Sequence, residues 1–426
     1  MQKKKNSRLV AAEIVAQWMV DRRFPDRQLA KIEHDNAFIM EVVNGVVRKY
    51  NILQWLEQGM VPKEPEPFFK AVLYVGLYQL LFMDNVEEYA VLNETVDAAK
   101  GRPGGHGNAG MINAVLRRAQ RERDQIFHEL KRQSDDIRLS HPDFLLQRWS
   151  RQYGEVEARK LAEWNNHPPE TVLRVEQTVI APEEFVAKMA EAGVELALHP
   201  FSDREKFYIL PRGLAVHRLP GYAEGWFTVQ DPATSVSVDL LRPFPGESVL
   251  DACAAPGGKT AMLASRMRGE GQLVAMDLHD DRIAVLRENM QRLRLEDWVE
   301  LVRGDARDPK KALGDRKFDA ILLDVPCLNT GVLRRRIDAR WRVNTNRLKA
   351  IAETQYAILS ACAELLKENG RIVYSTCSLE SEENEDLVAR WVREHPGFSK
   401  VKARTAFPPK SGTDGAFAAV IRRAVD

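Results

Sequence analysis

The second half of the chain alternates short apolar runs with amphipathic stretches, and this alternation restricts the fold more than any other feature. From about residue 236 onward, five apolar runs read as strands: ESVLDAC, GQLVAMDL, VELVRGD, FDAILLDV and GRIVYSTC. Helical stretches separate most of them, at 259–268, 281–293 and 346–368. Continuous apolar strands joined through helices are typical of a parallel sheet covered on both faces. We therefore expect an α/β domain with a mostly parallel sheet over residues 236–426.

The first 135 residues read as helices. Val10, Ile14 and Trp18 recur at helical spacing, and the run at 67–83 is apolar nearly all round. That run contains a lysine and is shorter than the roughly 20 residues of a membrane span, so it predicts a buried helix and no membrane partner. We predict a small all-α domain over residues 1–135.

Residues 136–235 read as a connecting helical and small α+β module. A helical stretch at 144–164 is followed by NNHPP, which breaks a helix. Strands are predicted at VLRVEQT, VELALHP and KFYILPRG, with a helix at 182–192. The chain as a whole is therefore predicted to be multidomain, with an α part followed by α+β and α/β parts.

The loop SVLDACAAPGGKT (248–260) follows the first predicted strand of the parallel sheet and ends like a phosphate-binding P-loop. A P-loop requires Gly-x-x-x-x-Gly-Lys-Ser/Thr, but Cys253 stands where its first glycine must be. This disfavours a P-loop ATPase. The remaining Gly257-Gly258 turn before a helix suits a carboxylate or a nucleoside, with a tight turn that binds no ligand as the alternative.

Acidic residues follow two further strands. Asp277 ends the second strand, where an acidic residue commonly binds the hydroxyl groups of a ribose; capping of the next helix is an equal alternative. Asp305, in the motif GDAR after the third strand, is in position to accept from an adenine amino group or to close a turn. Together with the loop, these residues predict a cofactor that contains a nucleoside.

Four cysteines occur in the chain, and two of them follow strands. They form no Cys-x-x-Cys pair and no metal-like spacing, which indicates a cytoplasmic chain with reduced thiols and no metal site. Cys362 lies in an apolar helix and is expected in the core. Cys327 and Cys377 lie where a parallel sheet binds ligands, so we expect both thiols to face one cleft beside Asp324. One of them is a candidate nucleophile.

A thiolate, a carboxylic acid and a nucleoside cofactor suit the methylation of a pyrimidine at carbon 5. That carbon is not nucleophilic in the aromatic ring. Addition of a thiolate to carbon 6 creates an enamine, and an aspartate at the N3 edge stabilises the developing charge. Carbon 5 then accepts the methyl group of S-adenosylmethionine, a base removes the carbon-5 proton, and the thiolate leaves.

Three motifs resemble the RNA cytosine-5 methyltransferases, which have a Rossmann-like class I methyltransferase domain: DACAAPGGKT, DVPCLNTGVLRRRIDARW and YSTCSLESEENE. In the helical part, DNAFIMEVVNGVVR and NAGMINAVLRR are similar to a NusB-type RNA-binding domain. GWFTVQDPAT (225–234) and the terminal DGAFAAVIRR complete the pattern. Essentially the whole chain resembles the bacterial 16S ribosomal RNA methyltransferase B (RsmB/Sun) family.

The resemblance implies a role for each residue after a strand. Cys377 would be the nucleophile, Cys327 would assist release of the product, and Asp324 would lie near the methyl donor and the target base. Asp277 would bind the ribose of S-adenosylmethionine, and Asp305 would lie near its adenine. The other residues expected to line this cofactor are Cys253, Ala254, Ala255, Pro256, Gly257, Gly258 and Lys259. Lys259 is also expected beside Asp324.

The resemblance further implies an RNA substrate, namely small-subunit ribosomal RNA. We expect a monomeric protein. Two basic stretches, at 117–132 and 334–342, are expected to contact phosphates, with a solvated helix face as the alternative for each. The target cytosine must be unstacked, which favours a single-stranded or loop target. The alternative function is a non-catalytic RNA-binding or ribosome assembly factor that retains the fold.

The chain departs from the family pattern at two places. After Pro326-Cys327 the family usually has Ser-Gly or Ser-Ala, whereas this chain has Leu328-Asn329. Ile337 replaces the proline of the family's Arg-x-Pro-Asp. We expect these bulkier residues to reshape the pocket for the target base.

Overall fold

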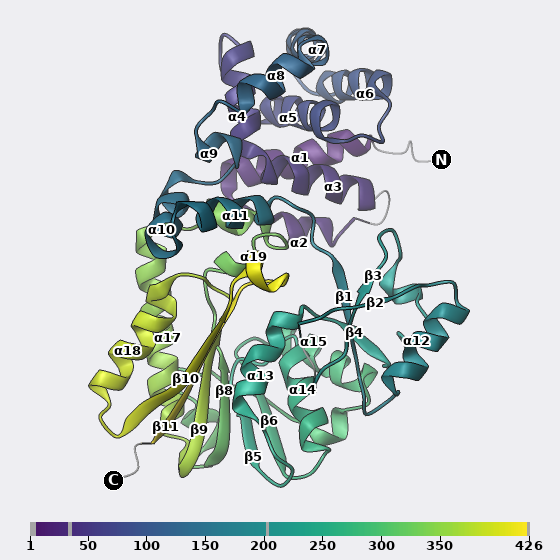
Figure 1. Cartoon of the computed structure of the whole chain (residues 1–426). Coiled ribbons are helices and arrows are strands. Elements are labelled where there is room, and N and C mark those ends of the chain that lie inside the picture. The colour runs from purple at the N-terminus through teal and green to yellow at the C-terminus, as the bar shows by residue number, and fades with distance from the viewer. Residues whose placement is uncertain (1–5, 33–35, 202–203, 424–426) are drawn as a thin grey trace. The chain divides into compact units, whose positions relative to one another are not determined.

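The structure is a computed structural model that describes residues 6–32, 36–201 and 204–423. It divides into two compact units, whose elements Figure 1 labels in chain order. The helical unit consists of Met1–Asn166 and Arg336–Arg342. The sheet unit consists of His167–Arg335 and Val343–Asp426.

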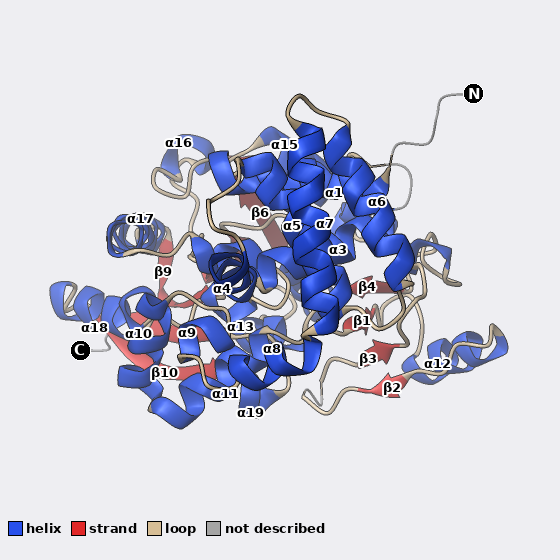
Figure 2. Ribbon diagram, turned by 90° about the horizontal axis from the view of Figure 1, so that it is seen from above, coloured by secondary structure: helices blue, strands red, loops and turns tan. Residues whose placement is uncertain are grey.

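The helical unit is built around α5, which is apolar nearly all round and therefore buried on every side. Helices α1, α3, α6 and α7 pack against it, as Figure 2 shows from above. Within the described residues, no helix is both long and apolar enough to cross a membrane. The helices are α1 Ser7–Asp21, α2 Pro25–Leu29, α3 Asn36–Arg48, α4 Tyr50–Met60, α5 Pro67–Phe82, α6 Glu88–Lys100, α7 Gly105–Arg121, α8 Arg123–Leu130, α9 Asp135–Arg138, α10 Asp143–Tyr153 and α11 Glu155–Asn165.

The helix predicted at 144–164 is two helices, α10 and α11, joined at Gly154. The backbone of Gly154 has φ 86° and ψ 154°, which a helix cannot accommodate. The apolar periodicity continues across this break because both helices bury residues such as Trp149 and Leu161. The unbroken spacing of apolar residues therefore predicted one helix and did not indicate the turn at Gly154.

The segment Arg336–Arg342 packs within the helical unit although it follows the Pro-Cys motif in sequence. Ile337 is buried with Trp18 and Val47, and the indole of Trp341 donates a hydrogen bond to the carbonyl of Val47. The structure therefore assigns the Ile337 side chain to the core of the helical unit. Its side chain belongs to a hydrophobic core, where an apolar residue larger than proline is readily accommodated.

The first sheet of the sheet unit is small and antiparallel, with strand order β2-β3-β1-β4. Helix α12 packs its Phe185 and Met189 against the apolar face of this sheet. The bounds are β1 Thr171–Val175, α12 Pro182–Glu191, β2 Ala197–Leu198, β3 Phe207–Leu210 and β4 Phe227–Val229.

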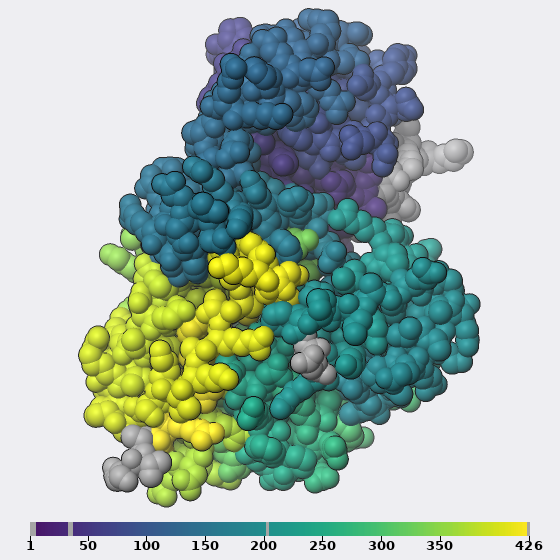
Figure 3. All heavy atoms as spheres, in the orientation of Figure 1, coloured from purple at the N-terminus to yellow at the C-terminus, as the bar shows by residue number. Residues whose placement is uncertain are grey.

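The second sheet has seven strands in the order β10-β11-β9-β8-β5-β6-β7. The strands from β9 to β7 run parallel, and β11 is antiparallel to both of its neighbours. Strands β10 and β11 form this antiparallel edge, and the described residues of this last part of the chain give the yellow surface in Figure 3. The bounds are β5 Ser248–Asp251, β6 Gln272–Asp277, β7 Glu300–Arg303, β8 Phe318–Asp324, β9 Leu366–Thr376, β10 Phe398–Ala406 and β11 Ala416–Arg423.

Helices cover both faces of the second sheet, as the continuous apolar strands predict. Helices α13, α14 and α15 pack on one face, and α16, α17 and α18 pack on the other. The predicted fold class is thereby confirmed. The bounds are α13 Ser235–Leu241, α14 Gly258–Met267, α15 Asp280–Arg292, α16 Lys310–Leu313, α17 Thr345–Ala363, α18 Glu385–Glu394 and α19 Pro408–Ser411.

The helix predicted at 346–368 is shorter than expected, because α17 ends at Ala363. The next strand, β9, already begins at Leu366, which pairs with Phe318 of β8. Pairing with a buried neighbouring strand outweighs the helical preference of the intervening Lys and Glu residues.

Candidate active site

The loop between β5 and α14 requires its two glycines. Gly257 has φ 106°, and a Cβ atom on it would lie 2.5 Å from Cδ1 of Leu286. A Cβ atom on Gly258 would lie 2.8 Å from Nε2 of Gln230. Gly257 also offers no side chain to cap α14, so the first amides of that helix receive no hydrogen bond acceptor from the capping position. The sequence predicted this tight strand-to-helix turn.

Asp277 lies at the end of β6 and holds the loop in place. Its Oδ2 accepts a hydrogen bond from the backbone N–H of Ala255 at 3.1 Å. Arg282, one turn into α15, donates to the carbonyl of Ala255 at 2.7 Å and lies 3.4 Å from Asp277. Arg282 therefore binds both the loop and the carboxylate beside it.

Asp305 closes the turn after β7, which was one of its two predicted roles. Its Oδ1 accepts from the backbone N–H of Arg307 at 2.9 Å, and the Arg307 guanidinium binds both carboxylate oxygens. The hydrogen bond from Arg307 lowers the pKa of Asp305. An adenine amino group bound here would share these oxygens with Arg307.

Asp251, the last residue of β5, is a buried carboxyl group at the base of the loop. Its Oδ2 accepts from the hydroxyl of Thr260 at 2.7 Å, whereas its buried Oδ1 has no partner within the described residues. Burial raises the pKa of Asp251 to about 7, against the hydrogen bond from Thr260. Sequence analysis did not single out this residue, because an aspartate at a strand end reads as a turn.

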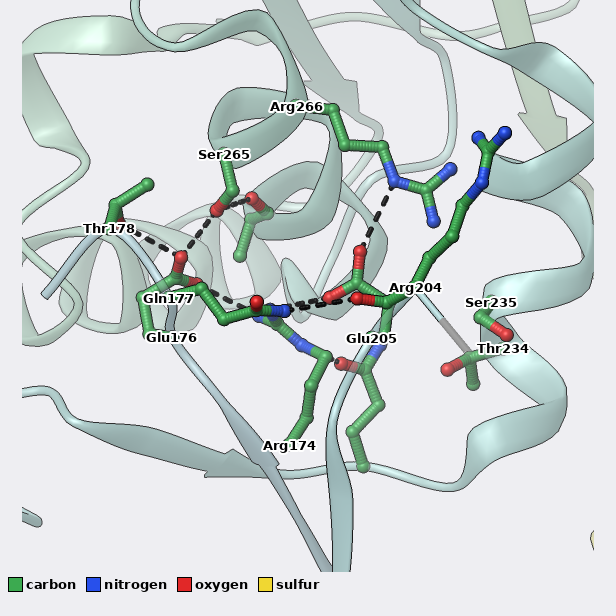
Figure 4. A network of polar contacts seen from close by, with 12 residues as sticks. Arg174, Glu176, Gln177, Thr178, Arg204, Glu205, Thr234, Ser235, Ser265 and Arg266 are labelled. Carbon is green, nitrogen blue, oxygen red and sulfur yellow. Dashed lines mark hydrogen bonds and ion pairs between the residues drawn. The ribbon is translucent and has the colours of Figure 1, made fainter. Parts of the chain in front are cut away.

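A buried polar network anchors α14 to the small sheet (Figure 4). Arg174 of β1 is fully buried and lies 3.1 Å from Glu176 and 3.6 Å from Glu205. Glu176 accepts from Ser265 on α14, and Arg266 on the same helix pairs with Glu205. Helix α14 is thus held by buried charged groups. Their burial is tolerated because each carboxylate and guanidinium is paired with another.

Lys259 lies beside Asp324, as expected. Its Nζ is 2.5 Å from Oδ2 of Asp324 at the end of β8; the Lys259 side chain is largely buried and that of Asp324 is half-buried. Burial lowers the pKa of Lys259, but the ion pair with Asp324 and the nearby Cys377 raise it by more. Lys259 therefore remains an ammonium group in the site.

The structure brings Cys327 and Cys377 together, with their Sγ atoms 3.1 Å apart. Both thiols are half-buried. The hydrogen bond with Cys377, together with burial, raises the pKa of Cys327 well above the ordinary value for a thiol. Cys362 is a core residue as predicted, and burial raises its pKa to about 12. Burial likewise raises the pKa of Cys253 in the loop.

Glu383 joins the loop after β8, which carries Cys327, to the loop after β9, which carries Cys377. Sequence analysis missed this residue. This fully buried carboxylate accepts from the backbone N–H of Leu328 at 3.0 Å and from the Gln355 amide at 2.9 Å. It also accepts from the hydroxyl of Ser378, next to Cys377. Burial raises the pKa of Glu383, against these hydrogen bonds. The only sequence signal was its place in the run SLESEENE after the Thr-Cys motif.

Thr330 and Gly331 bring the two loops into direct contact. The Thr330 hydroxyl lies 3.1 Å from the Ser378 hydroxyl and accepts from the backbone N–H of Leu379. Gly331 donates its N–H to the carbonyl of Cys377, and a Cβ atom there would lie 2.7 Å from that oxygen. The close approach of the backbones at Gly331 and Cys377 therefore requires a glycine at position 331.

The arginines of 334–342 do not form the phosphate-binding stretch that was expected. Arg335 bridges Asp231 and Asp414, and Arg334 donates to the carbonyls of His167 and Pro168. In the helical unit, Arg340 is fully buried and donates to backbone carbonyls, and Arg342 pairs with Asp338. Arg336 is the exposed member. This stretch is mainly structural, because its positive charges are already satisfied within the protein.

The basic stretch at 117–132 is different, because most of its charges face solvent. The exposed residues are Arg117, Arg118, Arg121, Lys131 and Arg132.

Among the described residues, no group of three or more histidine, cysteine or acidic side chains is arranged to hold a metal ion.

Comparison with known families assigns three regions of the chain. Residues 238–422 match the family described as 16S rRNA methyltransferase RsmB/F, and residues 5–121 match the NusB family. Residues 141–204 match the ferredoxin-like domain of RsmF/B-like methyltransferases. Ribosomal RNA small subunit methyltransferase B of Vibrio cholerae is 36% identical over 399 residues, covering 91% of this chain and 90% of that protein. The protein of the same name from Serratia proteamaculans is 35% identical, covering 92% of each chain.

Solved structures show the same folds. The crystal structure of PH0851 superposes with a TM-score of 0.78 at 24% identity, covering 98% of this chain and 99% of that one. A methyltransferase homologue from Pyrococcus horikoshii is 28% identical with a TM-score of 0.60, covering 68% of this chain and 98% of that one.

Proposed function

The chain belongs to the ribosomal RNA small subunit methyltransferase B family and is a methyltransferase, and on this premise we propose that it methylates carbon 5 of a cytosine in small-subunit ribosomal RNA. The proposed reaction passes through a covalent bond between Cys377 and the cytosine. The donor is S-adenosylmethionine.

One observation carries this proposal: two thiols lie 3.1 Å apart beside the Lys259–Asp324 ion pair. Cys327 and Cys377 follow β8 and β9, and Lys259 follows β5. In the strand order, the sheet reverses its winding between β5 and β8, which is where ligands bind in such sheets. A methyltransferase that acted only on an oxygen or an amino nitrogen would not need a nucleophile there.

The residues around the loop after β5 fit S-adenosylmethionine. Asp277 ends β6, where an acidic residue commonly binds ribose hydroxyls, and the uncapped N-terminus of α14 suits a carboxylate. The partnerless Oδ1 of Asp251 is a buried acceptor at the base of the same loop. When bound, S-adenosylmethionine supplies the methyl group that carbon 5 receives.

The chain's own residues perform the covalent steps of this proposal. The Cys377 thiolate adds to carbon 6 of the ring, and the S–C6 bond gives carbon 5 the electron density of an enamine. Asp324 passes a proton taken from the Lys259 ammonium to N3, which neutralises the negative charge that develops on the ring when the thiolate adds, while Lys259 fixes the orientation of Asp324.

Release reverses the first bond. A base removes the proton of carbon 5, and the electron pair of that C–H bond re-forms the C5–C6 double bond. The S–C6 bond breaks so that Cys377 leaves as a thiolate, and the proton on N3 returns to the Lys259–Asp324 pair. Cys327 remains a protonated thiol because its pKa is raised, so it is able to donate a hydrogen bond to the departing sulfur. In this way one thiol attacks and the other assists departure.

The helical unit is proposed to supply RNA affinity through the exposed charges of 117–132. A cytosine must leave its stack to reach a thiol, so a single-stranded or loop target fits best.

The test is a trapping experiment with RNA that contains 5-fluorocytidine, because fluorine cannot leave carbon 5 as a proton does. Wild-type protein with S-adenosylmethionine should form an adduct that survives denaturation, and Cys377→Ala should form none. An adduct formed by Cys377→Ala would show that Cys377 is not the nucleophile. Absence of an adduct with wild-type protein would favour a non-catalytic RNA-binding factor. Bisulfite mapping of ribosomal RNA from a deletion strain then identifies the target cytosine.

A further inference from the structure

Asn329 stands beside both thiols and has a backbone conformation that few residues adopt. Its φ is 63°, in the left-handed region that asparagine tolerates better than other residues with a side chain, glycine being the least strained. A glycine at this place would satisfy the backbone alone. Asparagine satisfies it and adds a carboxamide.

The carboxamide of Asn329 binds both cysteine residues. Its Nδ2 donates to the carbonyl oxygen of Cys327 at 2.9 Å, and its Oδ1 accepts from Sγ of Cys377 at 3.2 Å. A carbonyl oxygen can only accept, so the nitrogen of the amide must face Cys327 and the oxygen must face Cys377.

This orientation determines the direction of the contact between the sulfurs. The Cys377 thiol donates its one hydrogen bond to Asn329, so Cys327 must be the donor in the 3.1 Å Sγ–Sγ contact. Three hydrogen bonds then form a closed ring: Cys327 donates to Cys377, Cys377 donates to Asn329, and Asn329 donates to the backbone of Cys327.

We propose that Asn329 is a positioning residue that aims the Cys377 thiol and orders the two cysteines as donor and acceptor. This inference rests on the proposed function, in which Cys377 attacks and Cys327 assists its departure. Without the carboxamide, the Cys377 thiol can rotate, and either sulfur can donate to the other. Attack on carbon 6 then starts from the correct orientation less often.

Two substitutions separate this role from a backbone role. Asn329→Gly retains the left-handed conformation and removes the carboxamide. Asn329→Asp retains the conformation and size, loses the donor to Cys327, and places a negative charge beside the thiolate, which disfavours it. A backbone role alone predicts that all three residues perform equally, because each tolerates the left-handed region.

The first measurement is the single-turnover rate of adduct formation on 5-fluorocytidine RNA. We expect Asn329→Gly to be slower by about 3- to 10-fold, which corresponds to one neutral hydrogen bond. Asn329→Asp should be slower still, and RNA affinity should be unchanged in both. Rates within twofold of wild type for both variants, with unchanged thermal unfolding, would overturn the proposal.

The second measurement needs no RNA: alkylation of the free protein by iodoacetamide, followed at each cysteine by peptide mass spectrometry. Cys377 should react faster in Asn329→Gly, because its thiol loses an acceptor, and slower in Asn329→Asp. Buried Cys362 is the internal control and should not change. Unchanged alkylation of Cys377 in both variants overturns the inference even if the adduct is never observed. Absence of an adduct with wild-type protein counts against the proposed function alone.

Discussion

Lys259 Nζ lies 2.5 Å from Asp324 Oδ2, so an ion pair joins the loop after β5 to the end of β8. Asp324 lies at the end of β8, next to β9, which precedes Cys377, and the nearby Cys377 contributes to raising the pKa of Lys259. The ion pair connects the part of the site proposed for the cofactor to the part proposed for the base. This relationship supports the first prediction.

Lys259→Met should slow adduct formation by at least about tenfold, because it leaves Asp324 without its counterion in a partly buried place. RNA affinity should be unchanged, since the substitution leaves the exposed charges of 117–132 in place. Lys259→Arg is the matched control and should retain part of the rate. A Lys259→Met rate within twofold of wild type would show that Asp324 does not depend on this pair.

Cys327→Ala should accumulate a covalent complex with ordinary cytidine RNA, because the thiol that assists departure of Cys377 is missing. Denaturing electrophoresis of protein with labelled RNA measures the complex. The double variant Cys327→Ala, Cys377→Ala should give none. A Cys327→Ala protein that turns over normally without a trapped complex would contradict the role proposed for this thiol.

Asp251 should make the protein less stable as the pH rises from about 4 to about 7. Its folded-state pKa of about 7 lies above the ordinary 3.8, so the folded state binds more protons in this range and loses that advantage as they dissociate. At about 1.4 kcal/mol for each pKa unit, the loss amounts to about 4 kcal/mol. Above pH 7 the contribution is constant.

Asp251→Asn should remove this dependence, because the amide is neutral at every pH and can still accept from Thr260. Urea denaturation of both proteins at pH 5 and pH 8 provides the measurement. The variant should gain stability relative to wild type at pH 8 and little at pH 5. If the free energy of unfolding differs between variant and wild type by the same amount at both pH values, the pKa of Asp251 is not raised.

Arg340→Ala should destabilise the helical unit by about 3 kcal/mol, because it leaves buried carbonyl groups such as those of Ser140 and Asn165 without a donor. Hydrogen exchange of the α10 and α11 amides measures this locally. Arg336→Ala, an exposed neighbour, is the control and should change stability by less than about 0.5 kcal/mol. Equal effects of the two substitutions would contradict the structural role of Arg340.

Arg121→Ala should weaken RNA binding and its salt dependence together. Removal of one phosphate contact lowers the slope of log K against log salt by about 0.7 to 0.9. Filter binding across a salt series measures this slope. Arg393→Ala removes an exposed charge from α18 and should leave the slope unchanged. A slope unaffected by Arg121→Ala would exclude this residue from the RNA contact.

The sheet and the meeting of the two thiols were predictable because both follow from local patterns. Apolar runs defined β5 to β9, and the carboxyl ends of neighbouring parallel strands lie at one edge. Cys327 and Cys377 therefore had to be close once β8 and β9 were adjacent.

Buried charges were not predictable in the same way. Glu383 stands in an acidic run that reads as solvated, and its burial depends on the N–H of Leu328, which is distant in sequence. Arg340 reads as a member of a cationic cluster, but its acceptors belong to residues 140 and 165–166. A pattern of charge shows that a group needs a partner without showing whether the partner is RNA, water or the protein itself.

The segment Arg336–Arg342 also imposes an order on biosynthesis. The helices that carry Trp18 and Val47 are translated early, whereas Ile337 and Trp341, which cover them, are translated much later. Domains generally fold as they leave the ribosome, N-terminal first. Here the N-terminal helices leave the ribosome long before Ile337 and Trp341 are made, so Trp18 and Val47 lack this cover until most of the polypeptide has been synthesised.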